Sequence, residues 1–484
     1  MAATATARFT KRSMASFFLL TLNHAFAALV PPPSVLSTDA FKRVNPKSDR
    51  FDVLGFHHVE LYCSDATCTA GRFSHALGMD VLATSRNSRF ASIAIGSGDV
   101  KLSFTAPLPV EDAAAPPPAD GLAATLEYDA SDAHAFVENH GGVAVRAVCV
   151  RVADVKAAYD ACVDGGGEGV LSPRELVEPG GEAGQAAAAE VAEVKLYGDV
   201  VLRFLQLDED AYDGSHIPGY TDAQRGTSSG SSGGAADDDS FGIARFDHIV
   251  GNVWEMTPTI KRLQSMLGFH EFAEFTAEDV GTIDSGLNSM VLANNLQNVL
   301  LPINEPTYGT RRRSQIETYL VANKGEGVQH MALFTDDIFE TIRRMRRAGE
   351  RGGFQFMDAP SEQYYQELPE RIGDDVLSAE QLATAKELGL LVDRDPEGVL
   401  IQVFTRPVGD RPTLFLEIIQ RVGCMVDAPV EAAASPNAEA VEEQMLVEVV
   451  KVQRGGCGGF GKGNFKELFK SVEDYERSLE EAAA

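Results

Sequence analysis

Apolar and polar positions alternate through two short stretches near the C-terminal end, and a loop rich in proline and glycine separates them: GVLIQVF, then TRPVGDRP, then TLFLEIIQR. A period of two predicts strands, and the loop predicts a hairpin over residues 398–421. Glu417 lies among apolar neighbours in the second strand. Because an unpaired buried carboxylate is costly, the pattern indicates a basic partner, a raised pKa or a metal at Glu417. The alternative is an edge-strand glutamate turned to water.

The same order of predicted elements occurs in both halves of the chain. Residues 51–105 predict a strand, a helix and further strands, a similar unit follows to residue 207, and the order resumes after a linker. FHHVEL aligns with FDHIVG, which places His58 on His248, and Leu77-Gly78-Met79 then falls on Leu267-Gly268-Phe269 without a gap. The chain is therefore expected to be α+β, built from tandem βαβββ modules, with a helix at its C-terminal end.

Shifts in composition suggest where these units begin and end. The expected parts are a targeting or disordered segment (1–40), an N-terminal domain (50–215), a linker (216–240), a C-terminal domain (241–427), a variable loop (428–454), and a glycine-rich hinge with a gating helix (455–484). In the first part, basic residues precede the apolar run 14–30, which is short for a membrane span and ends near a possible cleavage site. If this segment is a targeting signal, a plastid is a possible location of the protein, and otherwise the cytoplasm is. No membrane span is expected in the mature protein.

Charge and cysteine content narrow the classes of function. The 484 residues carry a formal net charge of −29, which argues against a nucleic-acid surface, and a small anionic substrate would need local positive charge such as a metal. The six cysteines form no CxxC pair, so neither a disulfide framework nor a zinc ribbon is indicated, and reduced thiols are expected.

The alignment of the two halves singles out three residues. In the second unit of each half it puts Ala147 where His330 stands and Arg203 where Glu417 stands, so that only the C-terminal half holds two histidines and a glutamate at these positions. Two imidazoles and one carboxylate are the ligand set of a non-haem Fe(II) facial triad, which leaves adjacent coordination positions open, although zinc would also accept them. The alternative for each histidine alone is an ordinary core or strand-end residue.

A longer set of motifs carries a family resemblance. The motifs are FDHIVGNV, FAEFTAEDVGTIDSGLNSMVLANN, LLPINEP, SQIETYL, GVQHMALFTDDIF, LVDRDPEGVLIQVFTRPVGDRPTLFLEIIQRVGC and GGCGGFGKGNFKELFKSVEDYE. From about residue 50 onward the chain resembles the 4-hydroxyphenylpyruvate dioxygenase family of the vicinal oxygen chelate superfamily. The resemblance implies two half-open barrel domains of glyoxalase-like fold, of which the first is non-catalytic. It also implies a homodimer.

The resemblance further implies an activity and a set of site residues. The activity is the conversion of 4-hydroxyphenylpyruvate, an aromatic keto acid, and O₂ to homogentisate and CO₂ in tyrosine catabolism. The implied residues are His248, His330 and Glu417 for Fe(II), Ser289, Asn304, Gln315, Gln329 and Gln402 for the catalytic polar contacts, and Phe404, Phe415, Phe460, Asn464 and Phe465 for the substrate pocket. Hydroxymandelate synthase, with the same fold and substrate, and a non-catalytic metal-binding relative remain as alternatives.

Strand alternation supports part of this assignment. Gln402 and Phe404 share a face, as do Phe415 and Glu417. Gln329 is the exception, because the neighbour of His330 should point to the opposite face unless a bulge intervenes.

The C-terminal segment predicts a helix that starts at Asn464. Asn464 and Glu467 have the spacing of a capping box, and the apolar residues that follow recur at helical spacing: Phe465, Leu468, Phe469, Val472, Tyr475 and Leu479. The glycine-rich run before this helix favours a hinge, so the helix is expected to close over the pocket. Plain structural docking is the alternative.

Overall fold

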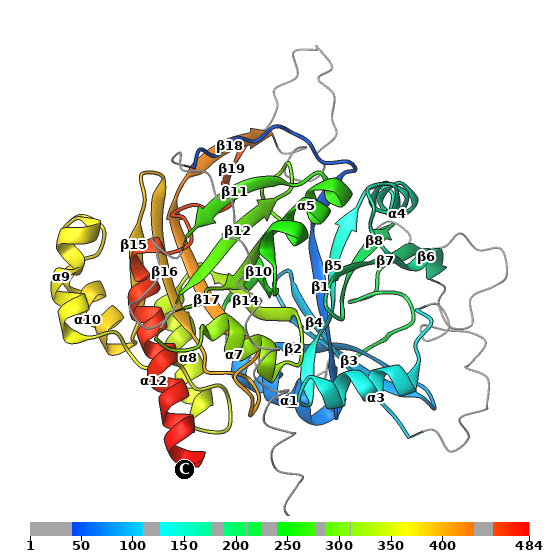
Figure 1. The fold of residues 1–484 in the computed structure, drawn as a ribbon, viewed down its shortest axis with the longest axis horizontal. Helices are drawn as coiled ribbons and strands as arrows, with labels where there is room; N and C mark the ends of the chain where they lie inside the picture. The colour runs from blue at the N-terminus through cyan, green and yellow to red at the C-terminus, as the bar shows by residue number, and fades with distance from the viewer. Residues whose placement is uncertain are drawn as a thin grey trace, which may run out of the picture. The chain divides into compact units, whose positions relative to one another are not determined.

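The computed structural model describes residues 41–109, 126–176, 188–208, 212–223, 240–276, 286–309, 311–429 and 449–483. The expected targeting segment lies outside these residues. Most of the expected linker and the centre of the expected variable loop also lie outside them. The described chain forms two large mixed sheets with helices against them and a small two-stranded sheet (Figure 1).

The first large sheet comes from the N-terminal half. Its strands are β1 (Val53–Cys63), β2 (Asp80–Arg86), β3 (Phe90–Ser97), β4 (Val100–Pro107), β5 (Val143–Val152), β6 (Gly169–Leu176), β7 (Ala189–Tyr197), β8 (Val200–Leu207) and β9 (Thr221–Asp222). They lie in the order β6-β7-β8-β5-β1-β4-β3-β2-β9. Two βαβββ modules are therefore joined through an antiparallel β1–β5 pair, and in each module the first strand pairs in parallel with the last.

The second large sheet repeats this arrangement in the C-terminal half. Its strands are β10 (Ile243–Asn252), β11 (His270–Phe275), β12 (Leu287–Ala293), β13 (Leu300–Pro306), β14 (Gly327–Thr335), β15 (Leu391–Arg394), β16 (Gly398–Phe404) and β17 (Phe415–Gly423). Their order is β11-β12-β13-β10-β14-β17-β16-β15, again with an antiparallel pair, β10–β14, at the centre. The predicted α+β class and the tandem modules are confirmed.

The helices lie between or beside the strands of the modules. They are α1 (Ala66–Leu77), α3 (Ala130–Asn139), α4 (Val155–Asp164), α5 (Met256–Leu267), α7 (Gln315–Ala322), α8 (Ile338–Gly349), α9 (Glu362–Ile372), α10 (Ala379–Glu387) and α12 (Phe465–Ala483), with a short 3₁₀ turn at Lys462–Asn464. Helices α1 and α5 both end at a glycine in the left-handed region, Gly78 with φ 62° and Gly268 with φ 76°. Only glycine adopts this conformation readily, which explains why the repeat holds at these two positions.

Pairing between strands confirms the alignment of the two halves. On the central pair of the second sheet Val250 lies opposite His330, and on the first sheet Glu60 lies opposite Ala147. Both strand pairs contain β-bulges at equivalent places. The extra residue is His57 in β1, directly before His58, and Asp247 in β10, directly before His248. A bulge turns its extra residue away from strict alternation.

The expected linker begins later than residue 216. His216, Ile217 and Tyr220 are buried in the core of the N-terminal half, and β9 pairs with β2 at the edge of the first sheet. The expected variable loop likewise begins and ends in strands, because β18 (Met425–Pro429) pairs with β19 (Val449–Gln453).

The C-terminal helix starts close to the predicted residue but without the predicted cap. The Asn464 amide oxygen accepts hydrogen bonds from Tyr364 and Arg371, and the Glu467 carboxylate accepts one from the backbone of Ser361. Both side chains of the expected capping box are therefore used in tertiary contacts. Local spacing predicted a cap because it could not register partners that lie about a hundred residues away in the chain.

Two of the six cysteines are joined, contrary to the expectation of reduced thiols. Cys424, after β17, forms a disulfide with Cys457 in the glycine-rich segment, 33 residues further on. No local motif marks this pair, because the fold alone brings the segment back against β16 and β17. The other four cysteines are free.

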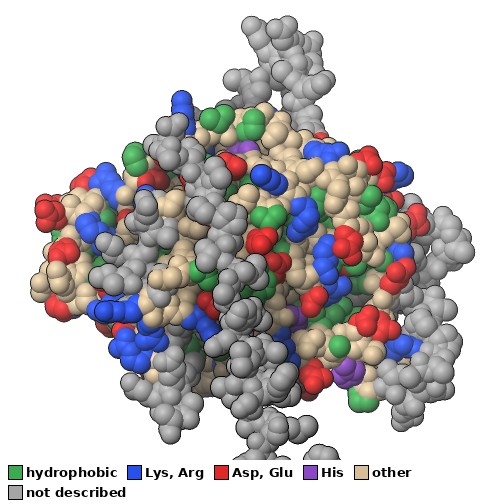
Figure 2. All heavy atoms as spheres, in the orientation of Figure 1, with side chains coloured by type: hydrophobic (Ala, Val, Ile, Leu, Met, Phe, Trp, Pro, Cys, Tyr) green, Lys and Arg blue, Asp and Glu red, His purple; other side chains and the backbone are tan. Residues whose placement is uncertain are grey.

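The surface carries charges of both signs (Figure 2), and the described helices are too short or too polar to span a membrane. Acidic and basic side chains are interspersed over the face shown in Figure 2. Among the described residues, no helix is both long and apolar enough to cross a membrane.

Candidate metal centre

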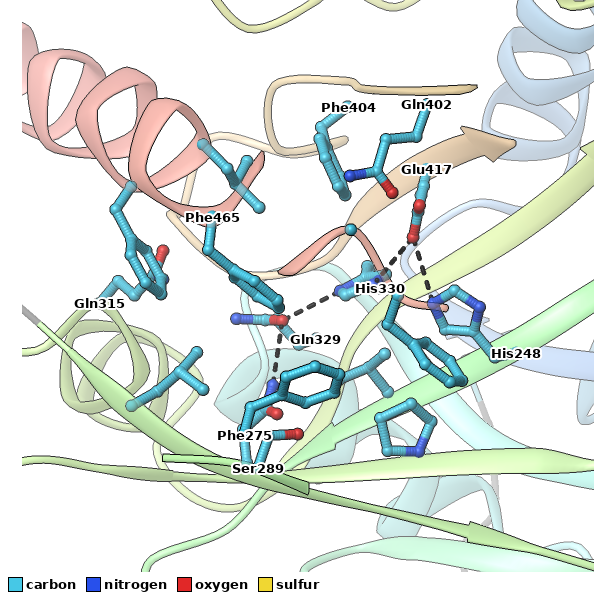
Figure 3. A pocket seen from close by; sticks show the side chains of 18 of the residues that line it. His248, Phe275, Ser289, Gln315, Gln329, His330, Gln402, Phe404, Glu417 and Phe465 are labelled. Carbon is cyan, nitrogen blue, oxygen red and sulfur yellow. Dashed lines mark hydrogen bonds and ion pairs between the residues drawn. The ribbon is translucent and has the colours of Figure 1, made fainter. Parts of the chain in front are cut away.

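His248, His330 and Glu417 meet on three adjacent strands, β10, β14 and β17. Ala332 pairs with both His248 and Glu417, and its single methyl group takes up little of the space between them. The Oε2 atom of Glu417 lies 3.1 Å from Nε2 of His248 and 3.4 Å from Nε2 of His330. Figure 3 shows both rings turned toward this carboxylate. The three predicted ligands are therefore brought together, and all three are at least largely buried.

The residue before each histidine fixes the ring that follows it. The Nδ1 atom of His248 donates to Oδ1 of Asp247 over 2.8 Å, and Nδ1 of His330 donates to Oε1 of Gln329 over 2.9 Å. Both preceding residues are the extra residues of β-bulges in the β10–β14 pair, which explains how neighbours in sequence point the same way. Because Nδ1 is used in these bonds, Nε2 is the nitrogen of each ring that faces Glu417 and that can bind a cation.

The electrostatics of the triad show how strongly the three groups interact. Burial lowers the pKa of His248, but the charge of Glu417 and hydrogen bonds to Asp247 and Glu417 outweigh burial and raise this pKa to about 9. Burial raises the pKa of Glu417, yet the two histidines outweigh it and lower the pKa to about 2. Burial lowers the pKa of His330. A proton on His248 thus balances the carboxylate, and a bound cation would replace that proton.

The donor set fits a transition-metal ion. Ligands about 2.1 Å from such an ion, at angles of about 90 to 109°, lie about 3.0 to 3.4 Å apart, which matches the two distances to Glu417. Two imidazoles and one carboxylate leave further coordination positions open for ligands from the pocket. The arrangement can hold one divalent ion and present it to a small molecule.

A pocket opens beside the triad and collects most of the predicted site residues. Its lining includes Ser289, Asn304, Gln315, Gln329, Gln402, Phe404, Phe415, Phe460 and Phe465. Phe415 stacks on the His330 ring at 4.8 Å between centroids, and Phe460 meets the His248 ring edge-on at 5.2 Å. Strand alternation predicted that Gln329 would point away from His330 unless a bulge intervened. A bulge is present at Gln329, and this residue therefore faces the pocket together with His330 (Figure 3).

Asn464 does not line this pocket. It is fully buried, and its amide oxygen is held by Tyr364 at 2.9 Å and Arg371 at 3.2 Å. The amide oxygen of Asn464 therefore fixes the start of α12, and the contact between Asn464 and substrate stays a prediction.

The structure adds residues that the sequence did not single out. Phe275 and Phe469 complete the aromatic wall, and Asp247 and Arg421 form a buried ion pair behind His248. The repeat contained a signal for Asp247, since its counterpart His57 also precedes a histidine and also bonds to it. Nothing local marked Arg421, whose partner lies 174 residues away.

The equivalent place in the N-terminal half is occupied by an arginine. The Arg203 guanidinium stands where Glu417 stands in the other half, and its nitrogen atoms lie 2.7 Å from carboxylate oxygens of Glu60 and Glu193. A further nitrogen, Nη1, lies 3.2 Å from Nε2 of His58. A fixed cation thus fills the equivalent position, and it directs a donor at the nitrogen that corresponds to the His248 ligand atom.

Three buried histidines beside Arg203 form a second candidate cation group: His57, His58 and His216. Because Arg203 donates to Nε2 of His58, the proton of this ring lies on Nδ1, which donates to Nδ1 of His57 over 2.7 Å. The lone pairs of the first two rings are thereby used in hydrogen bonds. Two ring nitrogens have no partner among the described residues, Nε2 of His57, which carries the proton of its ring, and Nδ1 of His216. Because the group contains no carboxylate and the Arg203 cation lies beside it, it is a poor match for a divalent metal.

Comparison with known proteins agrees with this geometry. Residues 245–403 match the Glyoxalase/Bleomycin resistance protein/Dioxygenase superfamily. The chain is 50% identical to a 4-hydroxyphenylpyruvate dioxygenase of Daucus carota, with 91% of each chain covered, and 45% identical to one of Arabidopsis thaliana, with 94% of this chain and 95% of the relative covered. Among solved structures, a mutant 4-hydroxymandelate synthase from Streptomyces coelicolor superimposes with a TM-score of 0.63 at 22% identity, over 88% of this chain and 99% of that one. The last likeness concerns the fold alone.

Proposed function

Because the chain belongs to the 4-hydroxyphenylpyruvate dioxygenase family and is a dioxygenase, we propose that His248, His330 and Glu417 hold Fe(II) and that the adjoining pocket binds 4-hydroxyphenylpyruvate. The reaction joins this keto acid and O₂ to give homogentisate and CO₂, in which all atoms of both substrates are retained. The observation that carries the proposal is the convergence of two Nε2 atoms and one carboxylate oxygen at the end of an aromatic pocket.

Fe(II) in this position supplies the redox chemistry and the positive charge that an α-keto acid chelate needs. The chain itself keeps the ligand nitrogens available, because Asp247 and Gln329 hold the Nδ1 protons of the two histidines. It also neutralises the buried carboxylate behind His248 through Arg421. These contacts fix the geometry before substrate arrives, which lowers the cost of reaching the reactive arrangement.

We propose that polar side chains in the pocket lining orient the substrate. Asn304 donates to Asn252 over 3.2 Å, and Gln402 and Gln315 lie on separate walls, so their amides can meet oxygen atoms at both ends of an aromatic keto acid. The phenylalanine side chains between them exclude water from the reacting atoms. We assign the keto-acid and phenol oxygens to this polar set and the ring to the phenylalanines.

The metal content of the purified protein tests the single-site proposal. We expect one bound metal ion per chain after iron loading, because Arg203 fills the equivalent position in the N-terminal half and that half is proposed to be non-catalytic. Elemental analysis with protein quantification gives the ratio, and His330→Ala should reduce it to near zero. Two ions per wild-type chain would contradict the proposal.

Phe404 tests the assignment of the ring pocket. Its centroid lies 6.1 Å from that of His330, and its side chain is 4% exposed, so it forms a wall beyond the ligands. We expect Phe404→Ala to raise by about tenfold the fraction of turnovers that release CO₂ without homogentisate, because a loosened ring is oxidised less often. Keto-acid affinity should change less than about threefold.

Phe356→Ala is the matched control for this change. Phe356 is similarly buried, at 6% exposure, but it does not line the pocket. Its loss should lower stability without changing the ratio of CO₂ to homogentisate. A collapse of keto-acid affinity in Phe404→Ala with the ratio unchanged would show that this residue serves the chelate and not the ring.

The homodimer stays a prediction, and light scattering coupled to gel filtration would measure it. A mass equal to one chain at working concentrations would contradict it.

A further inference from the structure

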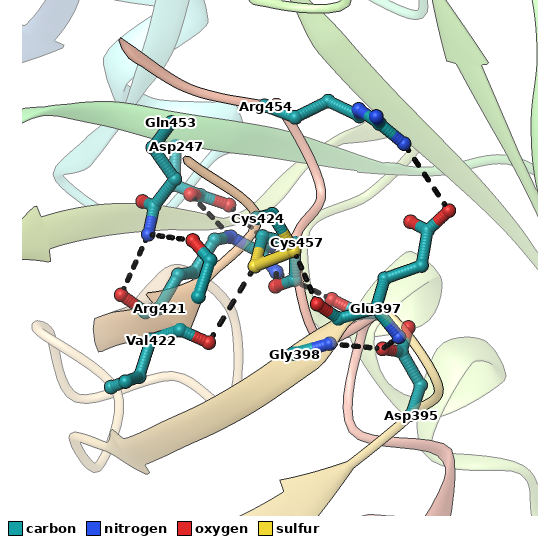
Figure 4. Close-up of a disulfide and its surroundings, with 12 residues drawn as sticks. Asp247, Asp395, Glu397, Gly398, Arg421, Val422, Cys424, Gln453, Arg454 and Cys457 are labelled. Carbon is teal, nitrogen blue, oxygen red and sulfur yellow. Dashed lines mark hydrogen bonds and ion pairs between the residues drawn. A yellow bond between two sulfur atoms is a disulfide. The ribbon is translucent and has the colours of Figure 1, made fainter. Parts of the chain in front are cut away.

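Arg421 connects two parts of the molecule that the chemistry needs together. Its side chain is fully buried at the end of β17, four residues after the ligand Glu417. The Nε and Nη2 atoms each donate to one carboxylate oxygen of Asp247 over 2.7 Å. On the other side, Nη1 donates to the backbone oxygens of Cys457 and Gly459 in the glycine-rich segment (Figure 4).

The carboxylate of Asp247 is shared between Arg421 and a ligand. Its Oδ1 atom accepts from Nδ1 of His248 and from Nη2 of Arg421. A continuous path of hydrogen bonds therefore runs from the His248 ring to the backbone of residues 457–459. Phe460 follows directly in the chain, and its ring packs against His248 and lies 5.5 Å from the Arg421 guanidinium.

The segment at the far end of this path is seated tightly. A side chain at Gly456 would come within 2.4 Å of Phe272, and one at Gly461 would come within 2.4 Å of the Gln402 amide. The segment thus places its backbone against the pocket in one arrangement. Arginine suits this junction because its planar fork of donors reaches a carboxylate and two carbonyls at once, which the single ammonium group of lysine cannot do.

We propose that Arg421 is a positioning residue that couples cation binding at the triad to the seating of the glycine-rich segment, residues 455–463. A bound cation requires the Nε2 atom of His248 in one orientation, and the bond from Nδ1 to Asp247 passes this constraint to the carboxylate, the guanidinium and the two carbonyls behind it. By linkage, a seated segment must favour the bound cation to the same extent. The inference rests on the proposed metal site.

Hydrogen exchange of the whole protein, with and without Co(II), tests this coupling. Co(II) accepts the same ligands, and its visible absorption reports binding independently of turnover. The amide of Gly459 donates to the Gly456 oxygen, and the amide of Asn464 donates to the Gly461 oxygen, so peptides over residues 455–464 report the seating. We expect Co(II) to slow exchange there at least about threefold in the wild type and not to slow it in Arg421→Lys.

Arg371→Lys is the matched control. Arg371 also contacts this region, through the Asn464 amide oxygen at 3.2 Å and the Val392 carbonyl at 3.1 Å, and neither contact leads to Asp247. Its variant should keep the slowing by Co(II). If Arg421→Lys does not fold, Asp247→Asn combined with Arg421→Gln removes the coupling without leaving an unpaired charge, and it should also lose the slowing.

The possible results separate the two proposals. Bound Co(II) with unchanged exchange in the wild type would overturn the coupling and leave the metal site intact. Equal slowing in the wild type and in Arg421→Lys would show that another contact, such as Phe460 on His248, carries it, and would overturn the role of Arg421. Absence of the Co(II) spectrum in the wild type would overturn the metal site itself and the inference with it.

Discussion

Replacing His330 with alanine should lower turnover at least about a thousandfold while the fold is retained. The change removes one of only three ligand groups, and a metal ion supplies several kcal/mol of charge stabilisation, at about 1.4 kcal/mol for each factor of ten in rate. The backbone of β14 keeps its pairing with β10 and β17, and Glu417 keeps His248 as its partner. Steady-state kinetics, elemental analysis and thermal unfolding of one preparation would measure turnover, metal content and retention of the fold.

His270→Ala provides the comparison for this experiment. His270 is 5% exposed and begins β11, away from the pocket lining, so its loss removes a buried imidazole without touching the site. We expect its variant to bind metal and turn over at close to the wild-type rate. Turnover in His330→Ala within about tenfold of the wild type would mean that the triad is not the centre of the reaction.

Deletion of residues 464–484 should leave the metal bound but reduce the homogentisate formed per O₂ by about tenfold or more. The three ligands lie on the central strands, whereas α12 contributes only to the wall, through Phe465, Leu468, Phe469 and Val472. Without the helix, water reaches the reacting atoms and diverts the oxidation. Oxygen consumption and homogentisate yield, measured together, give the ratio.

The truncation also removes buried side chains, so a lower free energy of unfolding must be distinguished from a direct effect on the homogentisate yield. Phe469 is 1% exposed and packs with Phe272 and Val291, so its removal alone costs about 3 to 5 kcal/mol. Phe465→Ala, at a half-buried position, should shift the ratio in the same direction with less loss of stability, and Lys470→Ala, on the exposed face, should leave it unchanged. A normal homogentisate yield in the truncated protein would show that α12 is only packing.

The sequence could predict the fold and the triad because both repeat within the chain. The matching glycines after α1 and α5 and the shared histidine anchored the alignment, and the alignment isolated His330 and Glu417 by their absence from the other half. The hairpin of β16 and β17 was visible as alternation, and its register, with Phe404 opposite Glu417, places Gln402 and Phe404 as expected.

What the sequence could not predict depends on contacts between distant residues. The orientation of Gln329 required a bulge, which is defined by the partner strand and not by the residue itself. The partners of Asn464 lie about a hundred residues away, so local spacing suggested a helix cap in their place. The Cys424–Cys457 disulfide and the Asp247–Arg421 pair arise in the same way, where the C-terminal segment returns to the second sheet.

The product formed from ¹⁸O₂ shows whether the triad carries out the dioxygenase reaction. The protein is loaded with Fe(II) without air, mixed with 4-hydroxyphenylpyruvate, exposed to ¹⁸O₂ and examined by mass spectrometry beside the Glu417→Ala variant. We expect homogentisate that carries both atoms of the labelled dioxygen, one equivalent of CO₂, and no product from the variant. Hydroxymandelate as the product, or equal homogentisate from Glu417→Ala, would contradict it.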